Sequence, residues 1–156
     1  MSYTFQIMTQ KQAYQIAYTW KYDGEYAFYD MTADEEDLEE FVDESRRGNT
    51  TYAVHKEDEM IGFYTFNLLP DGNVDIGLGM KPFLTGKGEG LRFIKAGLDF
   101  AISTFSARTF TLSVATFNER AIKVYKKMGF MPMGTFIQQT NGSSYEFMKM
   151  MHSVEE

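Results

Sequence analysis

Three alternating glycines lie where a predicted strand gives way to a predicted helix. Gly86, Gly88 and Gly90 follow the β-rich segment 74–80 and open an amphipathic stretch. Glycine lets the backbone turn tightly, and the free N–H groups of the first helical turn then point toward one spot. With the helix dipole behind them, these amides favour an anion such as a pyrophosphate, and Lys87 would add a charge-assisted contact. The segment therefore predicts an anion-binding turn.

The spacing of this run excludes two common phosphate-binding motifs. A P-loop needs Gly-Lys followed directly by Ser or Thr, which the segment 86–90 lacks. A dinucleotide fingerprint has glycines in the order G-x-G-x-x-G after the first strand of a βαβ unit, and this order also differs. The alternative to an anion-binding turn is a glycine-rich turn that starts a helix and binds no ligand.

A second segment carries a matching set of positions. It places Asn118, Ala121, Tyr125, Gly129 and Phe130 at fixed offsets. With the glycine run upstream of these residues, the sequence resembles the GNAT superfamily of acyl-CoA N-acyltransferases. The cofactor loop of that family reads Q/R-x-x-G-x-G/A, and residues 85–90 match it except at the first position, Thr85. A later family signature reads N-x-x-A-x-x-x-Y-x-x-x-G-F. It is matched here by Asn118, Ala121, Tyr125, Gly129 and Phe130.

The order of predicted elements agrees with this family over nearly the whole chain. Hydrophobic periodicity and turn residues predict strands over 3–8, 51–56, 60–67, 74–80, 110–114, 133–139 and 144–150, and helices over 10–20, 32–47, about 90–105 and 118–129. Thr32, with Glu35 three residues on, marks the start of the second helix as a capping box. This mixed order predicts an α/β or α+β domain with one mixed sheet. We expect a single domain over residues 1–156.

The resemblance implies a GNAT fold with a particular opening in the sheet. That fold has a mostly antiparallel, twisted sheet of about seven strands flanked by about four helices, with a V-shaped splay between the fourth and fifth strands. In the family, acetyl-CoA lies in this V. The resemblance then gives Leu78, Gly79 and Met80 as the strand edge that pairs with the pantetheine arm.

The resemblance also assigns the remaining cofactor contacts. The amides of the glycine loop would hold the pyrophosphate, and its residues are Thr85, Gly86, Lys87, Gly88, Glu89 and Gly90. Asn118 would contact the pantetheine or a nearby water. Tyr125 would lie near the thioester sulfur and donate a proton to the departing thiolate. Because Thr85 replaces the usual Gln or Arg, the resemblance does not carry over a side-chain contact to phosphate at this position, whereas it does carry over the backbone contacts.

The general base is less defined than the acid. An amine near neutral pH is mostly protonated, so a group must accept a proton before the amine attacks the thioester. Some family members carry a Glu five positions ahead of the Asn, where this chain has Ser113. Others use an acidic residue on the strand before the glycine loop, for which Asp75 is the candidate. Alternatively, Asp75 is an exposed carboxylate at the start of a strand with no catalytic role. Glu25 and Asp30 are further candidates for the base.

An aromatic segment in the N-terminal third is the candidate acceptor site. Tyr22, Tyr26 and Tyr29 fall in the region that forms the acceptor pocket in the family. Aromatic rings supply apolar contact and a π face for a cation. Some of these rings are alternatively core residues, and for Trp20 a core position is the better interpretation.

Composition narrows the classes of partner. The net charge of −7 and the lack of a basic patch argue against nucleic acid. No stretch predicts a membrane span or a signal peptide, and there is no cysteine, so we expect a cytoplasmic protein. His55 and His152 have no partners at metal-ligand spacing, so we expect no metal. A homodimer is common in the family and is a further expectation.

Two functions remain open from the sequence. One is an acetyl-CoA-dependent N-acetyltransferase that acts on a small amine, a polyamine, or a peptide or protein amino group. The other is a non-catalytic acyl-CoA-binding or sensing protein of the same fold. Thr85 and Ser113 keep the second reading open, whereas Tyr125 and Asn118 favour the enzyme.

Overall fold

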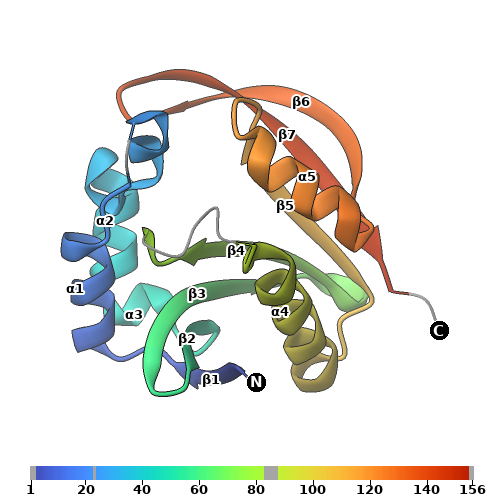
Figure 1. Cartoon of the computed structure of the whole chain (residues 1–156), viewed down its shortest axis with the longest axis horizontal. Helices are drawn as coiled ribbons and strands as arrows, with labels where there is room; N and C mark the ends of the chain where they lie inside the picture. The colour runs from blue at the N-terminus through green and yellow to red at the C-terminus, as the bar shows by residue number, and fades with distance from the viewer. Residues whose placement is uncertain (1–2, 23, 83–87, 155–156) are drawn as a thin grey trace.

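The computed structural model describes residues 3–22, 24–82 and 88–154, which form one sheet with helices on both faces (Figure 1). The strands are β1 (Tyr3–Ile7), β2 (Thr51–Lys56), β3 (Glu59–Leu68), β4 (Asn73–Met80), β5 (Thr109–Ala115), β6 (Met131–Thr140) and β7 (Ser143–Ser153). The α-helices are α1 (Gln10–Thr19), α2 (Glu35–Val42), α3 (Glu44–Arg47), α4 (Gly90–Phe105) and α5 (Glu119–Met128). Three 3-10 turns are η1 (Gly24–Tyr29), η2 (Met31–Ala33) and η3 (Pro70–Gly72).

The sheet has seven strands in the order β1-β2-β3-β4-β5-β7-β6. Every neighbouring pair is antiparallel except β4 and β5, which run parallel. A parallel pair needs a crossover, and α4 supplies it between these two strands. The predicted mixed, mostly antiparallel fold is therefore confirmed.

Two hydrophobic clusters hold the helices to opposite faces of the sheet. On one face, Phe93, Ile94 and Leu98 of α4 pack on buried strand residues that include Tyr64 and Phe66. On the other face, α1 and α2 pack on Ala53 and Phe63, and their contacts come from Ala13, Ile16, Ala17, Trp20 and Phe41. Trp20 is only 4% exposed, so the core interpretation of this residue is correct.

The expected second helix is the main local difference from the sequence prediction. Residues 32–47 form three short pieces instead of one helix, because two aspartates start new turns. Asp34 accepts a hydrogen bond from the Asp37 N–H and caps α2, and Asp43 does the same for α3 through the Ser45 N–H. An Asp side chain that bonds a nearby backbone N–H favours a helix start over a helix interior.

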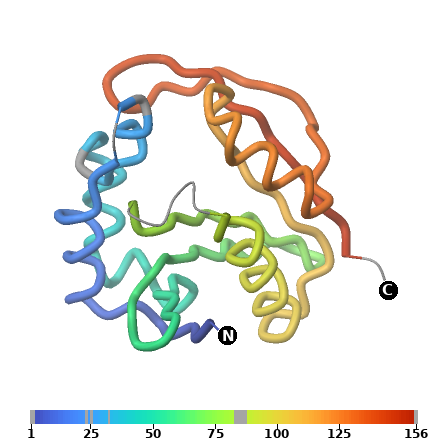
Figure 2. Tube along the Cα trace, viewed as in Figure 1, coloured from blue at the N-terminus to red at the C-terminus, as the bar shows by residue number. Residues whose placement is uncertain are grey.

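The β6–β7 hairpin reaches back across the molecule to the N-terminal segment (Figure 2). Its turn residue Asn141 donates a side-chain hydrogen bond to the Phe28 carbonyl of η1, at 2.9 Å. Asp34 accepts bonds from the Asn141 N–H at 2.8 Å and the Thr140 hydroxyl at 3.0 Å. The hairpin turn is therefore hydrogen-bonded to η1 and to the start of α2. Among the described residues, no helix is long and apolar enough to cross a membrane.

Candidate active site

Strands β4 and β5 diverge after a short paired stretch. Their parallel pairing covers Asn73–Thr109, Val74–Phe110 and Asp75–Thr111 and then ends. Beyond it, β4 stays paired with β3 as far as Met80, while β5 stays paired with β7 as far as Ala115. The two strands lead away from each other in Figure 1, so the sheet has the V-shaped opening that the resemblance implied.

The register shows which backbone groups of β4 face this opening. The Lys81 N–H donates to the Ile61 carbonyl at 2.8 Å, and the same register pairs Met80 with Gly62. Hydrogen-bonded and non-bonded pairs alternate along antiparallel strands. Met80 and Leu78 are therefore non-bonded toward β3, and their N–H and C=O groups point into the V. Gly79 instead points its backbone groups toward β3.

Tyr22 contacts the end of this strand edge. Its hydroxyl donates to the Met80 carbonyl at 2.6 Å, and its own N–H donates to Asp30 Oδ1 at 2.8 Å. Burial, with a smaller contribution from Asp30, raises the pKa of Tyr22 well above its usual value, so the hydroxyl stays protonated and can donate. The carbonyl of Met80 is thus engaged, whereas the Met80 N–H still faces the V.

The glycine loop is described only at its end. Thr85, Gly86 and Lys87 lie outside the described residues, whereas Gly88, Glu89 and Gly90 lead into α4. Gly88 has φ of +79°, in the region that favours glycine. Glu89 precedes α4 without capping it through its side chain, so its carboxylate leaves the first amides of the helix to another acceptor.

The carboxylate of Glu89 is held away from its own helix by β1 and β2. It accepts from the Tyr3 hydroxyl at 2.9 Å and from Lys56 Nζ at 3.2 Å, and Arg92 lies 4.0 Å away. The hydrogen bond from Tyr3 and then that from Lys56 lower the pKa of Glu89. Burial and the bond to Glu89 raise the pKa of Tyr3 to about 12. Sequence reasoning placed Glu89 in the cofactor loop but gave no signal of these two partners.

Asn118 joins the start of α5 to the aromatic segment. Its Oδ1 accepts from the Ala121 N–H at 3.2 Å and caps the helix, as Asn does at this position. Its Nδ2 donates to the Tyr29 hydroxyl at 3.1 Å. Both ends of the amide are therefore used within the chain. Burial raises the pKa of Tyr29, and the bond from Asn118 offsets part of this rise.

Tyr125 lies on α5 and is half-buried. It packs against the hydrophobic cluster on the face of the sheet that α4 covers. Burial, then the nearby Tyr29 hydroxyl, raises its pKa well above the usual value. Its hydroxyl is therefore protonated at neutral pH. Asn118, which binds Tyr29, therefore caps the helix that carries Tyr125.

Asp75 occupies the last paired position, where the V begins. Its Oδ1 accepts from the Thr111 hydroxyl at 2.7 Å, and the side chain is half-buried. Its neighbours Val74 and Ile76 are buried in the core under α4, so Asp75 points to the opposite face of the sheet. Asp75 and Tyr125 therefore lie on opposite faces. Strand geometry separates Asp75 from Met80 by five residues, or about 17 Å. Ser113 is exposed on β5.

The three acceptor-site tyrosines lie near the V, and each makes a contact within the chain. Tyr22 binds Met80 and Tyr29 binds Asn118, as described. The ring of Tyr26 has the guanidinium carbon of Arg120 4.3 Å from its centroid. Its π face therefore already carries a cation.

The hairpin adds aromatic residues that the sequence reasoning missed. Phe28 of η1 packs against Tyr145 at 4.7 Å, Phe117 at 5.5 Å and Phe147 at 5.9 Å, measured between ring centroids. The only sequence signal for these contacts was the alternation of apolar residues in the last strand. That alternation does not indicate which ring contacts η1.

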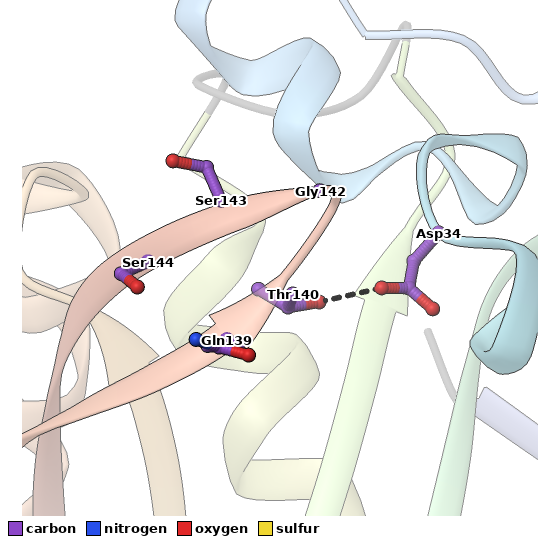
Figure 3. Close-up of a pocket in the computed structure, with 6 residues that line it drawn as sticks. All are labelled: Asp34, Gln139, Thr140, Gly142, Ser143 and Ser144. Atoms are coloured by element: carbon purple, nitrogen blue, oxygen red, sulfur yellow. Dashed lines mark hydrogen bonds between the residues drawn. The ribbon is translucent and has the colours of Figure 1, made fainter.

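A polar hollow lies beside the hairpin turn and not in the V (Figure 3). Its lining residues are Asp34, Gln139, Thr140, Gly142, Ser143 and Ser144. None of them belongs to β4, β5 or α5, so the hollow is separate from the candidate cofactor cleft. Within the described part of the chain, no group of three His, Asp or Glu residues is arranged to hold a metal ion.

The comparisons with known proteins agree with this architecture. A family model for the acetyltransferase (GNAT) domain matches residues 3–131. The chain therefore belongs to the GNAT acetyltransferase family. A search of curated proteins found no significant match.

Solved structures with the same fold are distant in sequence. The spermidine N-acetyltransferase from Vibrio cholerae, in complex with CoA and spermine, is 18% identical with a TM-score of 0.75, and the match covers 97% of this chain and 95% of that one. A GNAT-family acetyltransferase from Bacillus anthracis is 16% identical with a TM-score of 0.73, over 98% of this chain and 95% of that one. At this identity the likeness supports the fold alone.

Proposed function

We propose that this protein is an N-acetyltransferase that transfers an acetyl group from acetyl-CoA to a primary amine by direct attack in a ternary complex. The observation that carries the proposal is the open edge of β4, where Leu78 and Met80 turn backbone groups into a V bordered by Tyr125. An open strand edge inside a protein needs a partner for its N–H and C=O groups. The amide-containing pantetheine arm of acetyl-CoA supplies such a partner.

The start of α4 is the proposed pyrophosphate site. Among the residues that the structure describes, no side chain caps its first amides, and a helix N-terminus favours an anion. Gly88, Glu89 and Gly90 belong to the proposed loop together with Thr85, Gly86 and Lys87. The carboxylate of Glu89 would repel a phosphate, and its bonds to Tyr3 and Lys56 direct it elsewhere.

Two donors have the proposed catalytic roles. The Met80 N–H would stabilise the oxyanion that forms when the amine attacks, as backbone donors do in other acyl transfers. Tyr125 would give its proton to the departing thiolate, a role open to a phenol because it is protonated at neutral pH. Asn118 would orient the start of α5 and the Tyr29 hydroxyl.

Two carboxylates, Asp75 and Asp30, are candidates for the general base, and they differ in how they are connected to Met80. Asp75 would act on an amine near Met80 only through waters, because about 17 Å of strand lies between them. Asp30 is linked to Met80 through one residue, since Tyr22 bonds both. We therefore expect Asp30→Asn to lower kcat/KM at pH 7 more than Asp75→Asn does, with the acid limb of the pH profile altered. A larger and pH-dependent loss in Asp75→Asn would return the base role to Asp75.

The acceptor is proposed as a class: a small-molecule amine, a polyamine, or a peptide or protein amino group. The Vibrio cholerae relative in fold was solved with spermine and CoA, and this supports an amine acceptor for the present chain. Tyr22, Tyr26 and Tyr29 would border the acceptor, with Tyr26 already covered by Arg120.

The first experiment is calorimetric titration with acetyl-CoA, ATP and NAD, followed by an acetyl-transfer assay on a panel of amines. Selective binding of acetyl-CoA with turnover of at least one amine supports the proposal. Binding without turnover on any amine favours the non-catalytic acyl-CoA-binding alternative. Absence of acetyl-CoA binding refutes both. The same titration is repeated with Gly88→Glu. This variant places a side chain in the proposed pyrophosphate loop and should weaken acetyl-CoA binding.

A further inference from the structure

The sheet consists of two half-sheets that meet at one short seam. Strands β1 to β4 form one antiparallel half, and β5, β7 and β6 form the other (Figure 1). The seam is the parallel pairing of β4 with β5, which covers three positions, from Asn73–Thr109 to Asp75–Thr111. Parallel pairing is slightly less stable per residue than antiparallel pairing. The angle between the half-sheets therefore depends on few backbone bonds.

A side-chain hydrogen bond closes the seam at the end where the V begins. The Thr111 hydroxyl donates to Asp75 Oδ1 at 2.7 Å, a short distance that is usual for a charged acceptor. Thr111 lies on the face opposite α4, as Asp75 does, because its neighbours Phe110 and Leu112 are buried on the α4 side. Within the described ranges, Asp75 has no ion-pair partner, so the Thr111 hydroxyl is the side-chain group that engages it.

This bond differs in kind from the apolar contacts at the seam. Val74 and Phe110 belong to the hydrophobic cluster that α4 covers. Apolar contacts are non-directional, so they hold the half-sheets together without fixing the angle between them. A hydrogen bond weakens steeply when its geometry changes. The bond between Asp75 and Thr111 therefore keeps the last pair closed and determines where the strands part.

Two groups of the proposed reaction belong to different half-sheets. Met80 lies at the end of β4, whereas Tyr125 lies on α5, which follows β5. The last turn of α5 also contacts the second half, because the Gly129 carbonyl lies 3.2 Å from His152 Nδ1 of β7. The position of Tyr125 relative to Met80 therefore depends on the angle at the seam.

The length of β4 amplifies a small change of this angle. Met80 lies five residues beyond Asp75, or about 17 Å along the strand. A rotation of about 5° at the seam is a fraction of the usual angle between neighbouring strands, and it would move Met80 by about 1.5 Å. A misplacement of about 1 Å between reacting groups can lower a rate by about 100-fold.

We propose that Asp75 is a positioning residue, and that its hydrogen bond with Thr111 sets the angle between the half-sheets. This angle fixes the position of Tyr125 relative to Met80. The inference rests on the proposed acetyl transfer, and it gives the Asp75 carboxylate a role other than general base. The bonds of Tyr22 and η1 across the open end of the V remain without it, so the expected loss is partial.

The first test is kinetic and uses paired variants of each side chain. Thr111→Val and Asp75→Ala remove the bond, whereas Thr111→Ser and Asp75→Asn keep a hydroxyl donor and an oxygen acceptor. We expect the first pair to lower kcat about tenfold and the second pair to keep kcat within about threefold of the wild type. The dissociation constant of acetyl-CoA should stay within about threefold in all four, because the proposed pantetheine and pyrophosphate contacts lie on β4 and at the start of α4.

Ser45→Ala is the matched control for loss of a hydroxyl–carboxylate bond. The Ser45 hydroxyl donates to Asp43 Oδ1 at 2.6 Å on α3, away from the seam. This control should leave kcat unchanged. The melting temperature of every variant, compared with the assay temperature, checks that it is folded during the assay.

Coupling to Tyr125 separates positioning from a general loss of structure. If the bond acts through the position of the Tyr125 hydroxyl, it has nothing left to position in Tyr125→Phe. Thr111→Val should therefore lower kcat about tenfold in the wild type and about twofold or less in the Tyr125→Phe background. Equal losses in the two backgrounds would show that the bond does not act through Tyr125.

A distance measurement tests the seam without any turnover. The chain has no cysteine, so Glu59→Cys on β3 and Gln138→Cys on β6 allow one spin label on each half-sheet, both at exposed positions. We expect Thr111→Val to shift or broaden the distance between the labels by about 2 Å or more, as measured by pulsed electron paramagnetic resonance. Thr111→Ser should leave the distance unchanged.

Three further results would overturn the proposal. They are a wild-type kcat in Thr111→Val, label distances that do not respond to Thr111→Val, and a loss in Asp75→Asn as large as in Asp75→Ala. The last result, with an altered pH profile, is the signature of a general base. Absence of acetyl transfer to any amine would refute the proposed function instead, while a changed label distance would still support the role of the bond in setting the angle.

Discussion

Replacing Tyr125 by phenylalanine isolates the proposed proton donor. The Tyr125 ring packs half-buried against the core, and within the described residues its hydroxyl has no hydrogen-bond partner. Tyr125→Phe therefore keeps the packed ring and leaves no buried polar group unsatisfied. We expect the free energy of unfolding to change by about 0.5 kcal/mol or less.

The kinetic effect should be much larger than the effect on stability. A positioned general acid contributes roughly 10²–10⁴-fold to the rate. A thiol has an ordinary pKa of about 8.5, so a thiolate is a tolerable leaving group and the lower end of that range applies. We expect kcat to fall about 100-fold, which corresponds to about 2.7 kcal/mol of transition-state stabilisation. Affinity for acetyl-CoA should change by about threefold or less, since the lost proton acts at the leaving step.

The assay is steady-state release of free CoA thiol with a saturating amine, accompanied by calorimetric titration of acetyl-CoA. Tyr18→Phe is the control, because Tyr18 is 52% exposed on α1, away from the V. If kcat of Tyr125→Phe stays within threefold of the wild type while turnover is otherwise robust, Tyr125 is not the proton donor. A large loss of acetyl-CoA affinity would instead give it a binding role.

Three further changes probe the parts that hold the site. Gly97→Ala should lower the free energy of unfolding in urea by about 2 kcal/mol, because the new methyl group overlaps the buried Tyr64 ring and outweighs the helix propensity of Ala. Lys56→Met should raise KM for acetyl-CoA about threefold to tenfold with kcat unchanged, since it frees the Glu89 carboxylate beside the proposed phosphate site. For Asp34, the bond from the Asn141 N–H and then its other hydrogen bonds lower the pKa in the folded state. Its stabilisation is therefore present above the ordinary carboxyl pKa, near 4, and is lost as pH falls through the lower folded value. The melting temperature of Asp34→Asn should lie below that of the wild type at pH 7, and the gap should shrink as the pH falls below the ordinary carboxyl pKa.

The sheet and its opening could be predicted because their signals are local. The β-rich composition of 51–56 predicted β2 with the bounds that the structure has, and the Asn141-Gly142 pair predicted the last hairpin. The glycine run and Asn118 marked the starts of α4 and α5. These features depend on neighbours within a few residues, which a single sequence displays.

Contacts between distant segments could not be predicted in the same way. Asn118 and Tyr29 are 89 residues apart, and Asn141 and Asp34 are 107 apart. Nothing in the local pattern says that the hairpin turn meets α2 or that Tyr22 reaches Met80. The start of the second helix was misplaced at Thr32 for a related reason. Several residues of 32–43 could start a helix, and the hairpin contacts to Asp34 help to select the one that does.

The tyrosines of the aromatic segment show why the acceptor remains the least defined part of the site. A free ring or hydroxyl would point to the chemistry of its ligand, but each of these side chains already has a partner in the protein. Tyr22 bonds the strand edge, Tyr29 bonds the cap of α5, and Tyr26 lies under Arg120. These contacts tie the acceptor segment to both arms of the V. Since the same residues hold the cofactor side in shape, changing one of them alters the geometry at the thioester as well as the acceptor pocket. Loss of activity at a tyrosine of this group therefore does not identify the acceptor, whereas an altered preference between two amines at equal acetyl-CoA affinity does.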